Sequence, residues 1–152
     1  DPRVLTHLEF DAVLRDDPAA LKKAQSVVFI QCVGSRDERR PYCSRVCCTH
    51  SVKAAIALKE LNSQMNIYVI NRDIRTYGER EDLYRKARDL GVIFIRYDLD
   101  RKPMVRKEGD ELAVVGVEFG NEELQGADGF EMAERLVGIG RVAWEVVGVF
   151  ER

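Results

Sequence analysis

All four cysteines of the chain lie between residues 32 and 48, and the rest of its 152 residues contain none. They are Cys32, Cys43, Cys47 and Cys48, which gives the spacing Cys-x10-Cys-x3-Cys-Cys. Cysteines that serve as small core residues would be scattered, whereas these are gathered and two are adjacent. Tetrahedral metal sites and 4Fe-4S clusters both need four soft thiolate ligands that converge on one point. The motif therefore predicts a metal or iron–sulfur site that the remaining sequence has to position.

Other uses of four cysteines fit this spacing less well. Zinc fingers and ribbons pair two C-x-x-C units or add a His-x3–5-His pair, and neither occurs here. The common ferredoxin spacings are absent too. Two disulfides in a secreted domain are a further reading, but a chain of this length needs no such staples and shows no signal-peptide pattern. We therefore expect a reducing, cytoplasmic setting, with zinc or redox-active thiols as alternatives to an iron–sulfur cluster.

Composition and charge exclude several classes of function. Hydrophobic residues make up 45% of the chain and charged residues 33%, and the net charge is −2, which gives no reason to expect a nucleic-acid partner. No apolar run approaches the roughly 18 residues that a membrane helix needs. The chain begins at Asp1 without a methionine, and its length suits one domain. We expect residues 1–152 to be a single domain cut from a larger protein.

Hydrophobic periodicity predicts alternating strands and helices. Three apolar, β-branched runs predict strands at Val27–Val33, Asn66–Asn71 and Val92–Tyr97. Two amphipathic segments predict helices between them, from Ser44 or Cys47 to Asn62 and from Glu79 to Leu90. This β-α-β-α-β order requires parallel strands with right-handed crossovers. The predicted fold class is α/β, a Rossmann-like three-layer domain with a small parallel sheet and an appended antiparallel hairpin.

That hairpin is predicted from Pro103–Arg106 and Leu112–Phe119. In the tail, residues 120–152, the pattern fits a short helix at Phe130–Val137 and either a strand or a continued helix at Val142–Phe150. Several glycines weaken both assignments, so the tail has no firm prediction.

The beginning of the chain carries helix-start signals. Residues Val4–Leu14 predict a short helix or turn, with Thr6 as a possible N-cap and Glu9 at capping-box spacing. Pro18 is well placed to open a helical turn through Ala24.

The cysteines coincide with the first predicted strand-to-helix turn. In doubly wound sheets ligands bind outside the carboxyl ends of strands, and a dinucleotide domain would place a glycine-rich loop here. This turn offers only Gly34, which disfavours a pyrophosphate site and favours an anionic cluster near a helix N-terminus. We predict that Gly34, Arg36 and Arg45 surround the cluster. Taken singly, the arginines of the motif, Arg39 and Arg40 included, are more typical of a solvated loop than of a cluster site.

The motif resembles a known family. FIQCVGSRD, PYCSRVCC, the segment Arg72-Asp73-Ile74-Arg75 and the segment Gly91-Val92-Ile93-Phe94-Ile95-Arg96 are similar to the A-type flavoprotein subunit of heterodisulfide reductases. The resemblance covers about Val4 to Val105. It implies a piece of a thioredoxin-reductase-like flavoprotein core whose four cysteines hold a non-standard 4Fe-4S cluster close to the flavin. In such proteins the cluster would pass single electrons between the flavin and partner subunits.

The same resemblance sets expectations for cofactors and partners. The family's glycine-rich FAD fingerprint and its ferredoxin-type cysteine runs are missing from this chain. FAD is therefore expected only in the full-length protein, and the isolated segment is not expected to be catalytic. Expected partners are heterodisulfide reductase B- and C-type subunits and hydrogenase or ferredoxin-type donors. The alternative is a zinc-bound or metal-free Rossmann-like module that serves assembly or thiol redox sensing.

The remaining polar residues give weaker signals. His50 lies two residues after Cys48 and is more typical of a helix surface than of a hydrogen-bond donor behind the cluster, while His7 has no evident partner. Asp73 follows the second strand, where it could read a nucleotide or dock a partner, although a solvated loop is the simpler interpretation. No Ser-His-Asp arrangement, carboxylate pair or P-loop is visible, so no catalytic residue is predicted.

Overall fold

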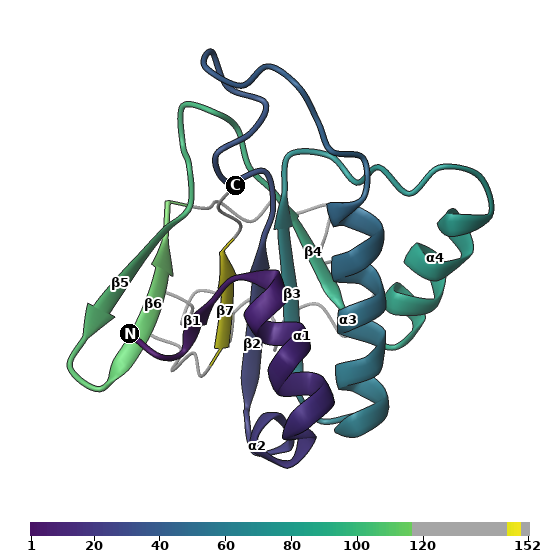
Figure 1. The fold of residues 1–152 in the computed structure, drawn as a ribbon, viewed down its shortest axis with the longest axis vertical. Helices are drawn as coiled ribbons and strands as arrows, with labels where there is room; N and C mark the ends of the chain where they lie inside the picture. Colours follow the sequence, from purple (N-terminus) through teal and green to yellow (C-terminus); the bar gives the residue numbers. More distant parts are fainter. Residues whose placement is uncertain (117–145, 150–152) are drawn as a thin grey trace, which may run out of the picture.

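The computed structural model describes residues 1–116 and 146–149 (Figure 1). The strands are β1 (Val4–Leu5), β2 (Ser26–Ile30), β3 (Asn66–Asn71), β4 (Ile93–Arg96), β5 (Met104–Glu108), β6 (Glu111–Val115) and β7 (Val146–Val149). The helices are α1 (His7–Asp16), α2 (Pro18–Lys22), α3 (Cys47–Leu61) and α4 (Glu81–Asp89), with a short 3-10 helix, η1 (Gly78–Arg80), ahead of α4. No helix within these ranges is both long and apolar enough to cross a bilayer.

Five strands form a parallel sheet in the order β1-β7-β2-β3-β4, and β5 pairs with β6 in an antiparallel hairpin. The chain runs outward from β2 to β3 and β4, and β7 then pairs with the opposite side of β2. The strand order therefore reverses between β2 and β7, which is the topological switch point of a doubly wound sheet. The predicted β-α-β-α-β unit, its parallel strands and the hairpin are confirmed.

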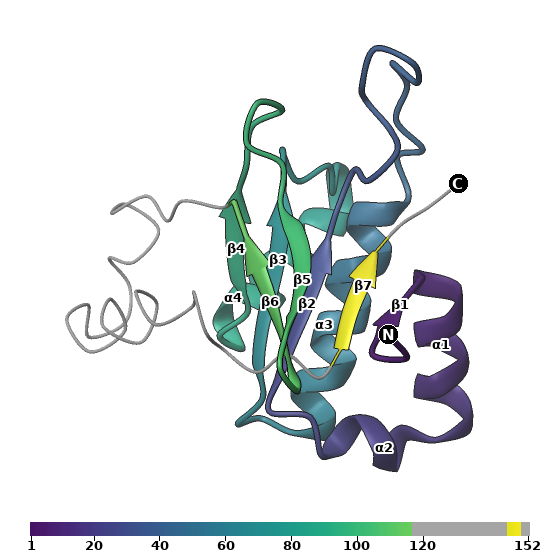
Figure 2. The same cartoon turned by 90° about the vertical axis from the view of Figure 1, so that its left-hand side faces the viewer.

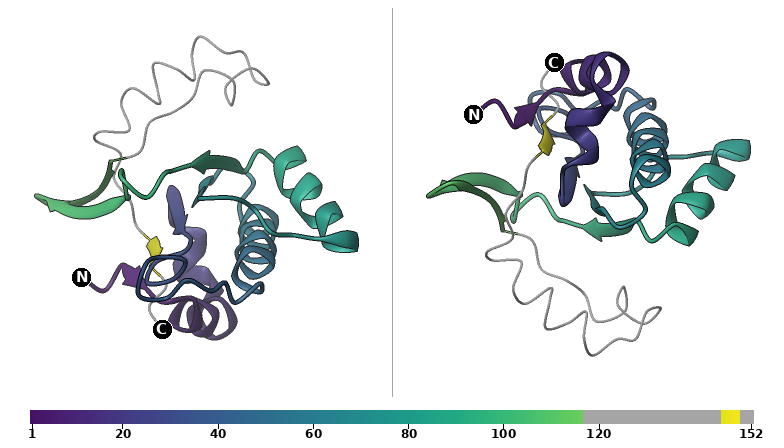
Figure 3. Two further views of the ribbon diagram at one scale, coloured as in Figure 1. Left: turned by 90° about the horizontal axis from the view of Figure 1, so that it is seen from above. Right: turned by 90° about the horizontal axis from the view of Figure 1, so that it is seen from below.

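Three layers result, because both faces of β2 and β3 are buried. Val27 and Phe29 of β2 belong to the core under the helices, whereas Val28 and Ile30 belong to a second core that includes Leu112 of the hairpin. Figure 2 and Figure 3 show the hairpin on the side of the sheet away from α3 and α4. The hairpin is thus a covering layer of its own, and the continuous apolar strand runs follow from burial on both sides.

Several boundaries differ from the prediction. The first strand ends at Ile30 and not at Val33, because Cys32 (φ 62°) and Gly34 (φ 66°) turn the chain into the left-handed region. Val4–Leu5 pairs with β7 as a strand, and the predicted helix begins only at His7. At the other end of the chain, the four residues of β7 form a strand, while the predicted helix at Phe130–Val137 lies outside the described residues.

The start of α1 carries the predicted capping box. The Thr6 hydroxyl accepts a hydrogen bond from the Glu9 backbone N–H at 3.3 Å, and the Thr6 N–H donates to the Glu9 carboxylate at 2.7 Å. The Thr6 N–H and the Thr6 hydroxyl both donate to the Glu9 carboxylate, and they lower the pKa of Glu9 from its ordinary value of 4.5. The predicted turn at Pro18 is α2, with Asp17 as its N-cap.

Candidate metal centre

The cysteines lie at the carboxyl end of the central strand β2. Cys32 follows β2 by two residues, Cys43 lies in the loop that rises above the sheet in Figure 1, and Cys47 and Cys48 are the first residues of α3. All four are free thiols; Cys48 is buried and the others are half-buried. The motif therefore occupies the switch-point edge of the sheet, as its position in the sequence predicts.

The backbone of this loop is strained. Among the described residues, those other than glycine with positive φ are Cys32 (62°), Arg36 (59°) and Arg45 (62°), and all three lie within the cysteine motif. Such conformations are uncommon for residues with a Cβ and are retained mainly at functional sites. Their concentration around the thiols supports a binding or redox role for this loop.

Cys47 and Cys48 form a thiolate–thiol pair at the start of α3. The neighbouring Cys48 thiol is the main reason that the pKa of Cys47 is lowered to about 5. The Ser44 hydroxyl, 3.5 Å away, and the backbone N–H groups of the first helical turn add to this effect. Cys47 and burial strongly raise the pKa of Cys48, and the Cys48 thiol donates to the Asp73 carbonyl at 3.8 Å.

Cys32 interacts electrostatically with this pair. Burial raises the pKa of Cys32, and the nearby Cys47 acts in the same direction, while the Arg36 guanidinium 3.8 Å from the Cys32 sulfur opposes both. Cys43 accepts a hydrogen bond from the Arg45 N–H at 3.3 Å. Three of the four thiols thus interact electrostatically with one another. In the described part of the chain, however, no three His, Cys, Asp or Glu side chains are grouped closely enough to coordinate a metal as they stand.

The residues present nevertheless fit an iron–sulfur or zinc group by their chemistry. Four free sulfur donors match the soft ligand set of both groups. The N-cap of α3, Val46, makes no side-chain capping bond, so the first N–H groups of the helix remain available to a negative charge. Arg36 beside Cys32 adds a positive charge.

The segment after β3 holds the cysteine loop in place. Asp73 forms ion pairs with Arg36 and with Arg75, the latter at 2.9 Å, and Arg72 donates a hydrogen bond of 2.6 Å to the Arg36 carbonyl. Burial acts to raise the pKa of Asp73, but the ion pairs with Arg75 and Arg36 outweigh it and lower the pKa. The segment is a partly exposed loop, as the simpler interpretation has it, but its charged side chains also bind the cysteine loop. The sequence shows the charges of this segment, but it does not show that Asp73 pairs with Arg36.

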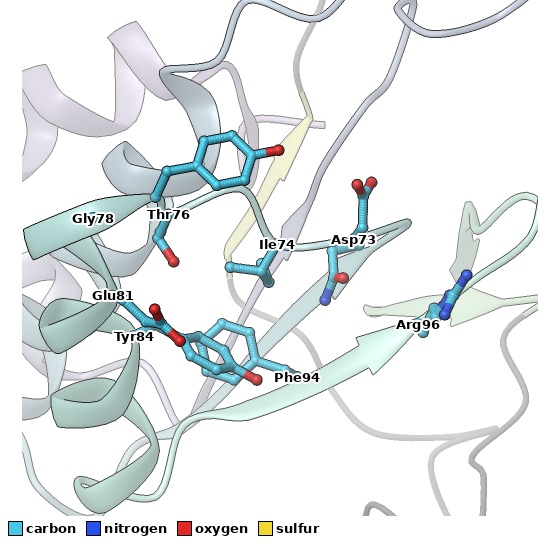
Figure 4. A pocket seen from close by; sticks show the side chains of 10 residues that line it. Asp73, Ile74, Thr76, Gly78, Glu81, Tyr84, Phe94 and Arg96 are labelled. Carbon is cyan, nitrogen blue, oxygen red and sulfur yellow. The ribbon is translucent and has the colours of Figure 1, made fainter.

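A cavity of about 510 Å³ opens beside this segment, at the ends of β3 and β4 (Figure 4). The rings of Tyr84 and Phe94 form its floor with centroids 4.6 Å apart, and Glu81 lies beside them. The Asp73 carboxylate points away from these rings, toward its arginine partners. Asp73 is therefore engaged in holding the loop and does not offer a free carboxylate to this cavity.

Two histidines are more involved than the sequence indicates. His7 is buried, and its Nδ1 lies 2.7 Å from Nδ1 of His50. His50 is half-buried and bonds Asp11 through Nε2 at 2.9 Å. The interpretation of His50 as a plain surface residue missed this link between α1 and α3. Both partners lie far away in sequence, so no local pattern could have identified it.

Sequence comparisons identify relatives of the chain. No family model matches it. It is 32% identical over 160 residues to the A-type subunit of the ferredoxin/F420H2-dependent CoB-CoM heterodisulfide reductase of Methanosarcina acetivorans, a match that covers 93% of this chain and 20% of that protein. The chain is homologous to one part of the A-type subunit of heterodisulfide reductases.

Two further A-type subunits match about half of the chain. Identity is 45% over 83 residues with that of the H2/formate:CoB-CoM heterodisulfide,ferredoxin reductase of Methanococcus maripaludis. It is 43% over the same length with the A-type iron-sulfur subunit of the CoB-CoM heterodisulfide reductase of Methanocaldococcus jannaschii. Each match covers 52% of this chain and 13% of the relative. The chain thus spans a fifth or less of the length of these three relatives.

Proposed function

We propose that the chain is the electron-transfer segment of a heterodisulfide-reductase-like iron–sulfur flavoprotein. The observation that carries this proposal is the placement of the four thiols. Cys32 lies just beyond the end of β2 and interacts with Cys47 and Cys48 at the uncapped start of α3, where a dinucleotide domain would hold a pyrophosphate. The name of the Methanocaldococcus jannaschii relative, an iron-sulfur subunit, supports the same class of cofactor.

In this proposal Cys32, Cys43, Cys47 and Cys48 hold a 4Fe-4S cluster, which supplies one-electron transfer when bound. Other groups of the chain stabilise the negative charge of these thiolates and position the loop. The first N–H groups of α3 and the Arg36 guanidinium compensate thiolate charge, while Asp73 fixes the position of Arg36. Gly34 and Arg45 provide the left-handed turns that bring the loop around.

The segment acts as one part of a longer redox chain in the cytoplasm. Reduction of a disulfide takes two electrons and a cluster exchanges one, so FAD in the full-length protein has to join the two. The expected partners are other oxidoreductase subunits, of the heterodisulfide reductase B and C types, with hydrogenase or ferredoxin-type donors. The names of the relatives, which are reductase subunits, support such partners.

A second candidate function follows from the Cys47–Cys48 pair. A thiol whose pKa is near 5 is largely thiolate at neutral pH, and it reacts readily with oxidants or soft metals. The same residues would then serve thiol redox sensing, or zinc binding in an assembly module, with no iron–sulfur cluster.

Anaerobic reconstitution with iron and sulfide separates the two functions. The cluster predicts brown protein with a broad absorption near roughly 400 nm, and a Cys47→Ser variant that loses most of it. Ser63→Ala is the matched control, because Ser63 is exposed, follows the far end of α3 and carries no thiol. If wild-type protein stays colourless and holds one zinc or no metal, the proposal that this segment transfers electrons is rejected.

A further inference from the structure

A buried pair of side chains connects the residue before Cys32 with the first residue of α3. Gln31 and Ser51 have no exposed surface. The Gln31 amide nitrogen donates to the Ser51 hydroxyl oxygen at 2.5 Å, and the Ser51 oxygen lies 3.0 Å from the Cys47 carbonyl, to which it donates. Two segments that carry thiols are therefore joined through the interior, in addition to the loop between them.

Gln31 is itself anchored at its backbone. Its N–H donates to the Ile70 carbonyl of β3 at 2.8 Å, and its carbonyl accepts the Tyr97 hydroxyl at 2.7 Å. Burial raises the pKa of Tyr97 to about 12, so this hydroxyl stays protonated and remains a donor. The anchor point of the pair is thus fixed to the strands beside β2.

The other end is supported from α1. Nε2 of His7 lies 3.3 Å from the Ser51 oxygen, and Nδ1 of His7 meets Nδ1 of His50. Because the Asp11 carboxylate only accepts, it assigns the proton of His50 to Nε2, and His7 then donates from Nδ1. Nε2 of His7 is left as an acceptor, so it competes with the Cys47 carbonyl for the single Ser51 proton.

A purely structural role explains this pair poorly. A hydroxyl that bonds back to the carbonyl four residues earlier is common in helices and needs no glutamine. The Gln31 carbonyl oxygen of the side chain is buried with no hydrogen-bond partner in the described part of the chain, which is costly. A methionine of similar shape would fill this space without that cost. What the glutamine adds is a directed bond to Ser51.

We propose that Gln31 and Ser51 are positioning residues that set the spacing between Cys32 and the Cys47–Cys48 pair. This inference rests on the proposed function, in which that spacing decides how the thiols meet a cluster. Neither side chain touches the cluster; each acts through the backbone of a neighbouring cysteine. Loss of either one lets the start of α3 shift relative to the end of β2.

The first test uses metal-free protein and Ser51→Ala. Thr49→Val is the matched control, since its hydroxyl is also buried in α3 but has no hydrogen-bond partner among the described residues. Hydrogen exchange is followed at the backbone amides of Gln31 and His50, which bond the Ile70 and Val46 carbonyls. We expect exchange about tenfold faster in Ser51→Ala only, the effect of one lost buried hydrogen bond. The amide of Val69 in β3 should not change.

The second test uses reconstituted protein. Ser51→Ala and Gln31→Met should each change the electron paramagnetic resonance g-values of the reduced protein and release iron to a chelator several-fold faster. The double variant should do no more than either single one, since both remove the same link. Thr49→Val should behave like the wild type.

The outcomes separate this inference from the proposed function. If Ser51→Ala and Thr49→Val show equal hydrogen-exchange rates at Gln31 and His50, the positioning role is overturned, whatever the metal content. If the wild type takes up no cluster, the proposed function fails and the exchange test alone decides on the pair. If Ser51→Ala does not fold, Gln31→Met decides; if neither folds, the pair serves general stability and the positioning role is rejected.

Discussion

Two helices of this chain begin in opposite ways. α1 starts with a complete capping box, in which Thr6 and Glu9 satisfy each other's backbone N–H groups. α3 starts with Val46, 61% exposed and without any side-chain capping bond, followed at once by Cys47 and Cys48. We call the start of α1 closed, because its own side chains satisfy its N–H groups, and the start of α3 open, because its N-cap side chain does not. Side chains therefore stabilise the start of α1 locally, whereas no N-cap side chain does so at the start of α3.

The largest effect should come from removing the thiolate of α3. Cys47→Ala leaves the N–H groups of α3 without the thiolate and the proposed cluster with three ligands. We expect iron retained after reconstitution and desalting to fall more than about tenfold, because all four thiolates complete the coordination. Far-ultraviolet circular dichroism should stay unchanged. Full iron retention in this variant would remove Cys47 from the ligand set.

The next largest effect should come from protonation of His7. His7 is the first residue of α1 and contacts Ser51 and His50 of α3. Burial, and then His50, lower the pKa of His7 from 6.5 to about 3. The neutral ring therefore stabilises the fold fully above pH 6.5, and this contribution is lost as pH falls toward 3. Between pH 6.5 and 5 the free energy of unfolding should drop by about 2 kcal/mol.

Denaturant titrations at several pH values measure this drop. His50 and Ser51 are polar groups in contact with His7, and Asp11 contacts His50. The His7→Gln variant replaces the buried ring and should be less stable at pH 7. Because glutamine does not titrate, the additional loss of unfolding free energy between pH 6.5 and 5 should disappear. An identical pH dependence in both proteins would show that His7 is not the group responsible.

A smaller effect is expected at the closed start of α1. Thr6→Ala removes the capping box and should lower the free energy of unfolding by about 1 kcal/mol at pH 7. The pKa of Glu9 is lowered in the folded protein, so only the part of the cap that uses its carboxylate is present above 4.5 and fades as pH falls below it. Thermal unfolding at pH 7 and in acid measures both. Iron uptake should not change, since the box lies on another helix.

The smallest effect should follow substitution at the open start of α3. Val46 is exposed and makes no capping bond, so Val46→Ala should change the free energy of unfolding by less than about 0.5 kcal/mol. Comparison with Thr6→Ala in one denaturant series checks this directly. Equal losses in both variants would show that the two helix starts do not differ in the way described.

The sequence predicted the parts that depend on local pattern. Periodicity located β2, α3, β3, α4 and β4, and the Thr6–Glu9 spacing predicted the cap of α1. It could not predict that β7 pairs between β1 and β2, because glycines interrupt that segment and its partners are distant in sequence. Likewise, the cysteine spacing located the candidate site, but Gln31–Ser51 and Arg36–Asp73 join residues that only the fold brings together.

Four thiolates at this edge of the sheet are proposed to hold a 4Fe-4S cluster, and cofactor content tests that proposal most directly. The measurement is the iron and acid-labile sulfide content of wild-type protein, reconstituted anaerobically with zinc present in equal amount. We predict about four iron and four sulfide per chain, with little zinc. One zinc per chain without sulfide, or free thiols without any metal, would contradict it.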